Sequence, residues 1–300
     1  MRVPTARGQQ LPDQTHEEGT TALSCGHTRT VTSHPWPANA VVDVTSVDEL
    51  VGLIAKGKLD QYTMVWRGVA NISWPLDSSL FRKLAVQHGR DHVTEAMMQT
   101  AEQELIAEAR RLRFDRMPDG EVLGDLALLA TLQHQGAATR LVDGTFNPLI
   151  AAWFAVEDEQ QDEEDGALLG IDMTDRSLDP QVAERGGPMR DVLSKGDFRL
   201  WRPPPVEQRI RAQQAVFILG KVPAPVTEMS SLDVKIMNRR ADRLFVDNPG
   251  SGRYAKRPLF VLRVQAGVKQ QLRRFLTGRL GMDAVSMYPD LAGFARARRA

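Results

Sequence analysis

Apolar residues recur with a helical period in several parts of the chain. Ser46 begins one such segment as a helix cap, and Asp48 and Glu49 lie in the first turn, where acidic side chains interact favourably with the helix dipole. The pattern therefore predicts a helix that continues from this cap to Lys56. The same criterion predicts further helices over residues 79–88, 94–114, 122–135, 148–156 and 268–279.

Strands are predicted where β-branched and aromatic residues cluster or alternate with polar residues. The segments with this pattern cover residues 62–68, 167–173, 212–219 and 259–264. No unit repeats at a fixed period, which argues against solenoids and propellers. We therefore expect an α+β fold with a central mixed or antiparallel sheet and helices packed on it.

Residues 1–38 are rich in Gly, Pro, Thr, Gln and His and show almost no apolar periodicity. Such a composition buries too little surface to offset chain entropy. We therefore expect a disordered tail, or an extension from an upstream start site, followed by one domain over residues 39–300. Polar or Gly- and Pro-rich composition also predicts a solvated loop over 157–165, a candidate lid over 174–206 and a mobile stretch over 247–257.

Charge and composition limit the class of partner. Lys plus Arg number 38 and equal Asp plus Glu at 38, so no overall field attracts nucleic acid or an anionic membrane. Cys25 is the single cysteine, and with His27 alone nearby it has neither a disulfide partner nor the ligand set of a zinc site. No apolar run approaches the roughly 20 residues that cross a bilayer, and no signal-peptide pattern opens the chain. We expect a cytoplasmic protein that holds no metal and contacts no membrane.

The first candidate for chemistry is Arg67, which follows Trp66 and precedes Gly68 at the end of a predicted strand. A buried guanidinium presents a planar fork that suits a carboxylate or a phosphate, and Gly allows a ligand to approach the backbone. The alternative is an Arg at the sheet edge whose charged end reaches solvent.

A second candidate is the polar segment that leads out of the helix predicted over residues 122–135. Its hydrogen-bonding side chains are Gln133, His134, Thr139, Arg140, Asp143 and Thr145. His134 lies in the last turn, where the helix dipole stabilises a cation. Thr145 or Asn147 caps the next helix, whose entrance could hold a phosphate. The alternative is a structural polar network in which Arg140 and Asp143 pair.

Gln213 and Gln214 form a third candidate, because they run directly into the strand predicted over residues 212–219. A Gln inside a sheet must find hydrogen-bond partners for its amide, so one of the two could orient a ligand. The alternative is an exposed residue at the edge of the sheet.

Together these segments, in this order, resemble the FRG domain family. The resemblance rests on Trp-Arg-Gly at 66–68, Trp-Pro-Leu at 74–76, Ser-Leu-Phe-Arg at 79–82, Leu-Gln-His-Gln-Gly at 132–136, Thr-Arg-Leu-Val-Asp-Gly-Thr at 139–145, Pro-Leu-Ile-Ala at 148–151, Gln-Gln-Ala-Val-Phe at 213–217 and Tyr-Pro-Asp-Leu-Ala-Gly at 288–293. The family is named for a Phe-Arg-Gly triplet, so Trp66 departs from its pattern. Val142 and Gly144 depart as well, since Leu and Trp look more usual there.

A weaker likeness extends to the ADP-ribosyltransferases, whose first motif is similar to Arg67-Gly68 and whose second is a Thr-x-x-Pro-x-x-Ala-x-x-Phe-Ala block. That block is filled here by Thr145, Pro148, Ala151, Phe154 and Ala155. In those enzymes the Arg holds the NAD phosphate, the hydroxyl motif lines the nicotinamide pocket, and a Glu on a later strand contacts the ribose. Two Gln residues stand on the corresponding strand here. The resemblance therefore implies that Asp143 or Glu207 supplies the carboxylate, or that a nucleotide is bound without turnover.

The resemblance implies an ADP-ribosyltransferase-like fold and an NAD- or nucleotide-handling protein of the bacterial toxin or phage-defence kind. Arg67 would hold phosphate, His134 and Thr145 would surround the base or ribose, and Gln213 would position the ligand. The candidate catalytic residues are His134, Asp143 and Gln213, and the candidate ligand-binding residues are Arg67, Gly68, Gln133, Thr139, Arg140, Thr145 and Gln214. One cleft should collect the side chains of Arg67, His134, Asp143 and Gln213.

The alternative function is a non-catalytic module that binds nucleic acid or a protein partner through basic side chains. These side chains are Arg209, Arg211, Arg239, Arg240 and Arg243. A net charge of zero and an aromatic content of 6% argue against an extended stacking surface for nucleic acid.

Overall fold

The computed structural model describes residues 34–56, 59, 62–117, 120–179, 189–194, 198–204, 208–234 and 259–291. Most of the predicted tail and the predicted mobile stretch at 247–257 lie outside these residues. Trp36 corrects the predicted boundary of the tail, because its indole is buried and its Nε1 donates a hydrogen bond of 2.8 Å to the carbonyl oxygen of Ile72. Packed structure therefore includes a residue that composition alone assigned to the tail.

In the described part of the chain, seven strands form one sheet in the order β1-β7-β4-β2-β3-β6-β5. The strands are β1 (Val41–Val44), β2 (Met64–Val69), β3 (Val142–Thr145), β4 (Gly166–Asp172), β5 (Arg199–Trp201), β6 (Ala215–Leu219) and β7 (Leu259–Val264). β1 is parallel to β7, and the other neighbouring pairs are antiparallel. The predicted α+β class with a mixed sheet is confirmed, while the finer likeness to ADP-ribosyltransferases remains a prediction.

The helices follow most of the predicted segments. They are α1 (Val47–Lys56), α2 (Ser79–His88), α3 (Glu95–Arg111), α4 (Asp125–His134), α5 (Pro148–Val156), α7 (Met189–Ser194), α8 (Gln208–Ala212), α10 (Ala266–Leu280) and α11 (Ala284–Met287), with short 3-10 turns at Ala38–Ala40, Arg90–His92 and Glu159–Gln161. Ser46 caps α1 as predicted, because its Oγ accepts a hydrogen bond of 3.1 Å from the backbone N–H of Glu49. Among the described residues, no helix is both long enough and apolar enough to cross a bilayer.

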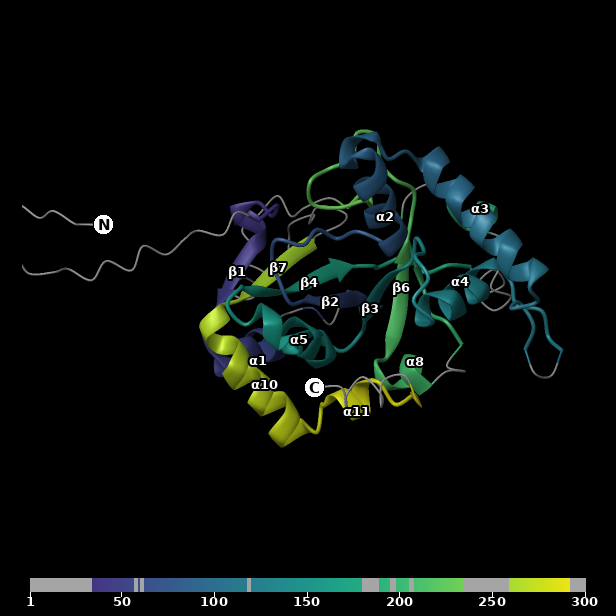
Figure 1. The fold of residues 1–300 in the computed structure, drawn as a ribbon. Helices are drawn as coiled ribbons and strands as arrows, with labels where there is room; N and C mark the ends of the chain where they lie inside the picture. Colours follow the sequence, from purple (N-terminus) through teal and green to yellow (C-terminus); the bar gives the residue numbers. More distant parts are fainter. Residues whose placement is uncertain are drawn as a thin grey trace, which may run out of the picture. The chain divides into compact units, whose positions relative to one another are not determined.

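Helices α1, α5 and α10 cover one face of the sheet (Figure 1). Their apolar side chains pack with Trp66, Leu168 and Phe260, which alternate with polar or oppositely directed residues along β2, β4 and β7. On the other face, Val65 and Leu169 pack with side chains from the long connections. The core therefore has two layers, and the sheet between them is buried on both faces.

Three strands were not predicted from the sequence. β1 and β5 have only four and three residues, which is too short for a periodic pattern to show. β3 carries Asp143 and Gly144, residue types that are depleted in strands, so its segment showed no strand pattern. The expectation that residues 174–206 are irregular is also corrected, because their described part contains β5 and α7, while the lid stays a prediction.

The strand predicted over residues 212–219 begins later than expected. Ala212 is the last residue of α8, and β6 begins at Ala215. Gln213 and Gln214 therefore form a turn between a helix and a strand, and Gln214 adopts a left-handed φ of 45°. The prediction that both Gln residues lie in a strand was wrong.

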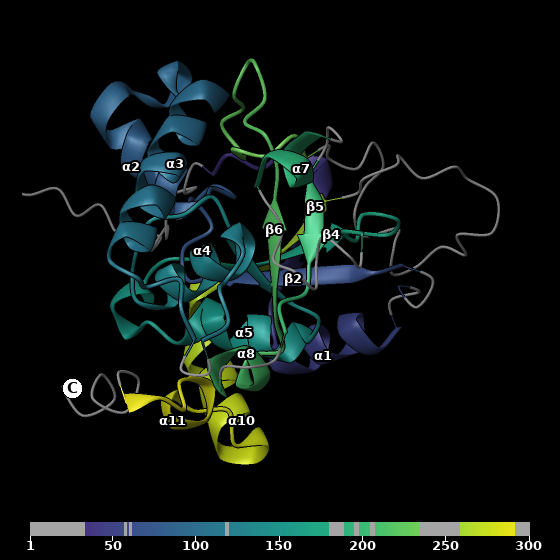
Figure 2. The ribbon, with the colours of Figure 1, turned by 90° about the vertical axis from the view of Figure 1, so that its right-hand side faces the viewer.

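The sheet divides between β2 and β3. β2 pairs with β4 from Met64 to Val69, but within the described strands it pairs with β3 at one position only, where Trp66 lies opposite Thr145. β3 pairs with β6 along all four of its residues. Figure 1 and Figure 2 both show β6 running steeply across the direction of β2. Two sub-sheets, β1-β7-β4-β2 and β3-β6-β5, therefore meet at a single pair of residues and diverge beyond it.

Candidate ligand-binding pocket

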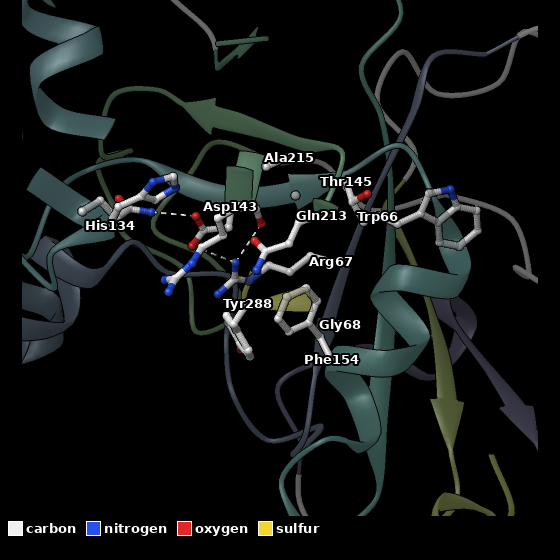
Figure 3. A pocket seen from close by; sticks show the side chains of 13 residues that line it. Trp66, Arg67, Gly68, His134, Asp143, Thr145, Phe154, Gln213, Ala215 and Tyr288 are labelled. Atoms are coloured by element: carbon white, nitrogen blue, oxygen red, sulfur yellow. Dashed lines mark hydrogen bonds and ion pairs between the residues drawn. The ribbon is translucent and has the colours of Figure 1, made fainter. Parts of the chain in front are cut away.

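A pocket with a volume of about 260 Å³ opens where the two sub-sheets diverge (Figure 3). It is lined by Trp66, Arg67, Gly68, Gln133, His134, Asp143, Gly144, Thr145, Phe154, Arg209, Gln213, Ala215 and Tyr288. The predicted convergence of Arg67, His134, Asp143 and Gln213 on one cleft is confirmed as geometry. The division of the sheet explains it, because strands that stop pairing leave room for side chains from both sub-sheets.

Arg67 joins the two sub-sheets across this pocket. Its Nη1 donates a hydrogen bond of 2.7 Å to the backbone carbonyl oxygen of Asp143 and lies 3.7 Å from the carboxylate oxygen Oδ2 of the same residue. Among the described residues Asp143 is its one hydrogen-bond or ion-pair partner, so Nε and Nη2 remain available to a ligand. Burial lowers the pKa of Arg67 and the charge of Asp143 opposes that shift, but a guanidinium keeps its proton at neutral pH.

The carboxylate of Asp143 is held in place by a short chain of side chains. Gln133 donates from Nε2 to Oδ1 of Asp143 at 2.7 Å, and the hydroxyl of Thr139 donates to Oε1 of Gln133. Thr139 is fully buried and does not line the pocket, so it orients Gln133 and is not the ligand contact that we predicted. The side chain of Asp143 is 59% exposed, and its carboxylate therefore stays accessible to a ligand.

Arg140 does not line the pocket, contrary to the prediction that it contacts the ligand. Its side chain is 1% exposed, and it binds Glu102 from Nε at 2.6 Å and Glu95 from Nη1 at 3.1 Å. Burial raises the pKa of Glu102, and the positive charge of Arg140 opposes that shift. The predicted pair between Arg140 and Asp143 is therefore replaced by an ion-pair cluster with α3.

Gly68 lines the pocket, but packing explains why it is Gly. A Cβ atom at this position would lie 1.8 Å from the backbone carbonyl oxygen of Ala151 on α5. Only Gly lets α5 pack this closely on β2. The predicted reason, ligand approach to the backbone, is therefore not needed to explain the residue.

Thr145 and His134 both line the pocket as predicted. Thr145 is buried, and its Oγ1 accepts a hydrogen bond of 3.1 Å from the backbone N–H of Asn147. Asn147 in turn caps α5 through Oδ1, which accepts from the N–H of Leu149 at 2.9 Å, so the cap is Asn147 and not Thr145. His134 is the last residue of α4, next to the Gln133 that holds Asp143.

Gln213 and Gln214 differ in their relation to the pocket. Gln213 lines it and donates from Nε2 to the carbonyl oxygen of Met287 at 3.0 Å. Gln214 is exposed and lies outside the lining. The prediction that Gln214 binds the ligand is therefore not supported by its position.

Tyr288, directly after α11, forms the remaining wall with Phe154 of α5 and Arg209 of α8, and sequence reasoning did not assign these three residues to the site. The hydroxyl of Tyr288 donates to Oε1 of Glu157 at 3.0 Å, and its ring centroid lies 6.3 Å from that of Phe154 (Figure 3). Arg209 places its guanidinium carbon 5.0 Å from the Tyr288 ring centroid. Signals for these residues existed, because Phe154 belongs to the Thr-x-x-Pro block and Tyr288 to the motif that looks like the FRG ending. Phe154 and Tyr288 are far apart in the sequence, so their contact could not be predicted from a local pattern.

The basic side chains proposed for nucleic acid or protein binding are only partly described. Arg209 pairs with Asp290, at 2.7 Å from Nη2 to Oδ2, and Arg239, Arg240 and Arg243 lie outside the described residues. That alternative remains a prediction. Within the described ranges, no group of three or more His, Cys, Asp or Glu is placed to hold a metal ion.

Comparison with known protein families finds a match for part of the chain that forms this pocket. The model of the FRG domain family matches residues 62–164. No curated protein and no solved structure matches the chain. The chain therefore carries an FRG domain over these residues. The matched segment supplies Arg67 and Asp143, whereas Arg209 and Tyr288 come from beyond it.

Proposed function

We propose that this FRG domain protein binds an NAD-type nucleotide in the pocket and acts on it as an ADP-ribosyltransferase-like effector. The observation that supports the proposal most is the pair of Arg67 and Asp143. A cation with unused donors stands next to an accessible carboxylate, inside a cavity that also has aromatic walls. NAD matches this arrangement, because it combines phosphates, ribose hydroxyls and a positively charged nicotinamide ring.

Arg67 is the phosphate-binding residue in this proposal. Its Nε and Nη2 present two N–H groups in one plane, which is the geometry that binds two phosphate oxygens at once. The bond from Nη1 to the Asp143 carbonyl oxygen fixes the plane before a ligand arrives. Binding therefore needs little rearrangement of this side chain.

Asp143 is the proposed catalytic carboxylate. It can accept a hydrogen bond from a ribose hydroxyl and stabilise the positive charge that develops at C1′ as the bond to nicotinamide breaks. The electron pair of that bond leaves with nicotinamide, whose ring becomes neutral. Water or a nucleophile on a target then bonds to C1′ and loses a proton. Gln133 keeps the carboxylate in position through its hydrogen bond of 2.7 Å.

The size of the pocket limits how the nucleotide is placed. Its volume of about 260 Å³ lies just below the usual range of ligand pockets, which is roughly 300–1,000 Å³. One half of a dinucleotide therefore fits inside. We place the nicotinamide ribosyl half within reach of Asp143 and the aromatic side chains of Phe154 and Tyr288, and the adenosine half at the mouth.

NAD turnover by the purified full-length chain tests this proposal. The protein is incubated with labelled NAD, with and without cell lysate, and nicotinamide release and label transfer are measured. We expect release or transfer that falls by about a hundredfold in Asp143→Asn, on the order of what loss of a transition-state electrostatic contact costs. Asp91→Asn, which changes an exposed Asp outside the pocket, is the matched control and should keep full activity.

Two results would change the proposal in different ways. If neither release nor transfer occurs but ADP-ribose still binds, the protein holds a nucleotide without turning it over. If neither NAD nor ADP-ribose binds, the proposal is wrong. Growth arrest on expression in bacteria, relieved by Asp143→Asn, is the expected behaviour of a toxin or phage-defence effector.

A further inference from the structure

Arg209 is a second guanidinium in the pocket, and the function proposed above does not use it. It lies on α8, which leads into β6, whereas Arg67 lies on β2 of the other sub-sheet. The Nε and Nη2 groups of Arg209 both bind the same oxygen, Oδ2 of Asp290, at 2.8 and 2.7 Å. Among the described residues its Nη1 has no hydrogen-bond partner. One Arg on β2 and one on α8 therefore each keep a donor for a ligand.

The position of Arg209 is fixed by the segment after α11. Its guanidinium carbon lies 5.0 Å from the ring centroid of Tyr288, within cation–π distance. Gln213, on the same connection, donates to the carbonyl oxygen of Met287 at 3.0 Å. Figure 2 shows α8 next to α11, in agreement with these contacts. The side chain is therefore held before a ligand binds, which lowers the entropy cost of using it.

We propose that Arg209 is a second anion-binding residue of the pocket and that, with Arg67, it selects a ligand with two linked phosphates over one with a single phosphate. This inference rests on the proposed function, because it assigns the second phosphate of the same nucleotide. The phosphate would bind the Nη1 donor of Arg209, which the two bonds to Asp290 leave unused. A ligand with a single phosphate, bound to Arg67, makes no contact with Arg209 and therefore binds with lower affinity.

A purely structural role for Arg209 predicts a different effect of substitutions at Arg209 and Asp290. If the Arg only fastens the segment after α11 through Asp290, then removing either partner should have the same effect on the pocket. If Arg209 binds phosphate, removing Asp290 leaves the cation in place and takes away its competitor. The variants Arg209→Gln and Asp290→Asn therefore separate the two roles.

Calorimetric titration of the full-length protein with ADP and with AMP tests the proposal, because the two probes share base and ribose and differ by one phosphate. We expect the wild-type protein to bind ADP more tightly than AMP by about tenfold or more, the size of one charge-assisted hydrogen bond. In Arg209→Gln this ratio should fall to about one. Arg211→Gln, on the same helix but outside the pocket lining, should keep the wild-type ratio, and Asp290→Asn should keep or raise it.

The possible results of this titration distinguish failure of the second phosphate site from failure of the proposed function. The second phosphate site would be overturned if the wild-type protein bound ADP and AMP with equal affinity. It would also be overturned if the affinity ratio survived in Arg209→Gln, or if Asp290→Asn and Arg209→Gln lost it equally. The nucleotide function itself would stand in those cases. If the wild-type protein binds neither probe, the proposed function fails together with this inference.

Discussion

Arg140 and Arg67 are both partly or fully buried arginines near the middle of this fold, yet their surroundings differ. Arg140 is 1% exposed and binds two carboxylates of α3, those of Glu102 and Glu95. It also donates from Nη1 to the carbonyl oxygen of Gly220 at 3.2 Å. Arg67 has a single described partner, Asp143, and faces a cavity.

The difference between the two regions shows how to separate a structural Arg from a ligand-binding one. Around Arg140 the protein supplies the negative charge itself, because an unpaired guanidinium in the core would be costly. Around Arg67 the described residues supply one partner, Asp143, and the side chain lines the pocket. The first arrangement stabilises the fold, and the second is suited to an anionic ligand.

The largest expected effect is on stability, in the variant Arg140→Gln. It leaves the buried carboxylate of Glu102 without its partner, so the free energy of unfolding should fall by about 3–5 kcal/mol. Chemical denaturation measures this loss. The control Arg111→Gln removes an exposed pair with Glu108 and should cost less than about 1 kcal/mol. Equal losses in the two variants would show that the Arg140 cluster is not structural.

A smaller loss in the free energy of unfolding is expected for Gly68→Ala, which tests the packing of the pocket wall. The added methyl would meet the carbonyl oxygen of Ala151, so α5 must shift, at a cost of about 1–3 kcal/mol. Gly278→Ala is the matched control, because Gly278 lies within α10 with nothing within 4 Å of an added Cβ. That control should gain about 0.5–1 kcal/mol of helix stability. If Gly68→Ala were as stable as the wild-type protein, close packing would not explain this Gly.

The smallest effect on the free energy of unfolding is expected for a substitution at Asp283. This residue caps α11 and so supports the part of the pocket wall that contains Tyr288. Hydrogen bonds from Ser286 lower the pKa of Asp283, so its stabilising effect is present above the ordinary Asp value and is lost as the pH falls through the lowered pKa. Asp283→Ala should cost about 1 kcal/mol at pH 7. Denaturation at several pH values should show a constant difference from pH 8 to 5 that shrinks below pH 4. A difference that grows on acidification would contradict the cap.

Much of the fold could be predicted from the sequence, because its longer elements have clear patterns. The bounds of α2, α5 and β7 agree with the predicted ones, since caps such as Asn147 and a run of apolar residues mark them. β3 could not be predicted in this way, because four residues that include Asp143 and Gly144 carry no strand signal of their own. It becomes a strand by pairing with β6, which is a tertiary effect.

The candidate site was predicted in part. Polar side chains in a short segment identified Asp143 and Gln133, but spacing could not distinguish the side chains that reach the cavity from those that support it. Thr139 and Arg140 are adjacent to each other in the sequence and both turn into the protein interior. Arg209 and Tyr288 reach the pocket only through the packing of α8 and α11, which no local pattern records.

Arg67→Lys provides the most direct test of the central claim that Arg67 serves a ligand rather than the fold. Lys keeps the positive charge but loses the planar pair of donors. Titration with ADP-ribose should show a loss of affinity of about ten- to a hundredfold, on the order of one or two charge-assisted hydrogen bonds, while Tm without ligand stays close to that of the wild-type protein. Unchanged affinity for ADP-ribose, or a fall in Tm as large as that of Arg140→Gln, would contradict the account.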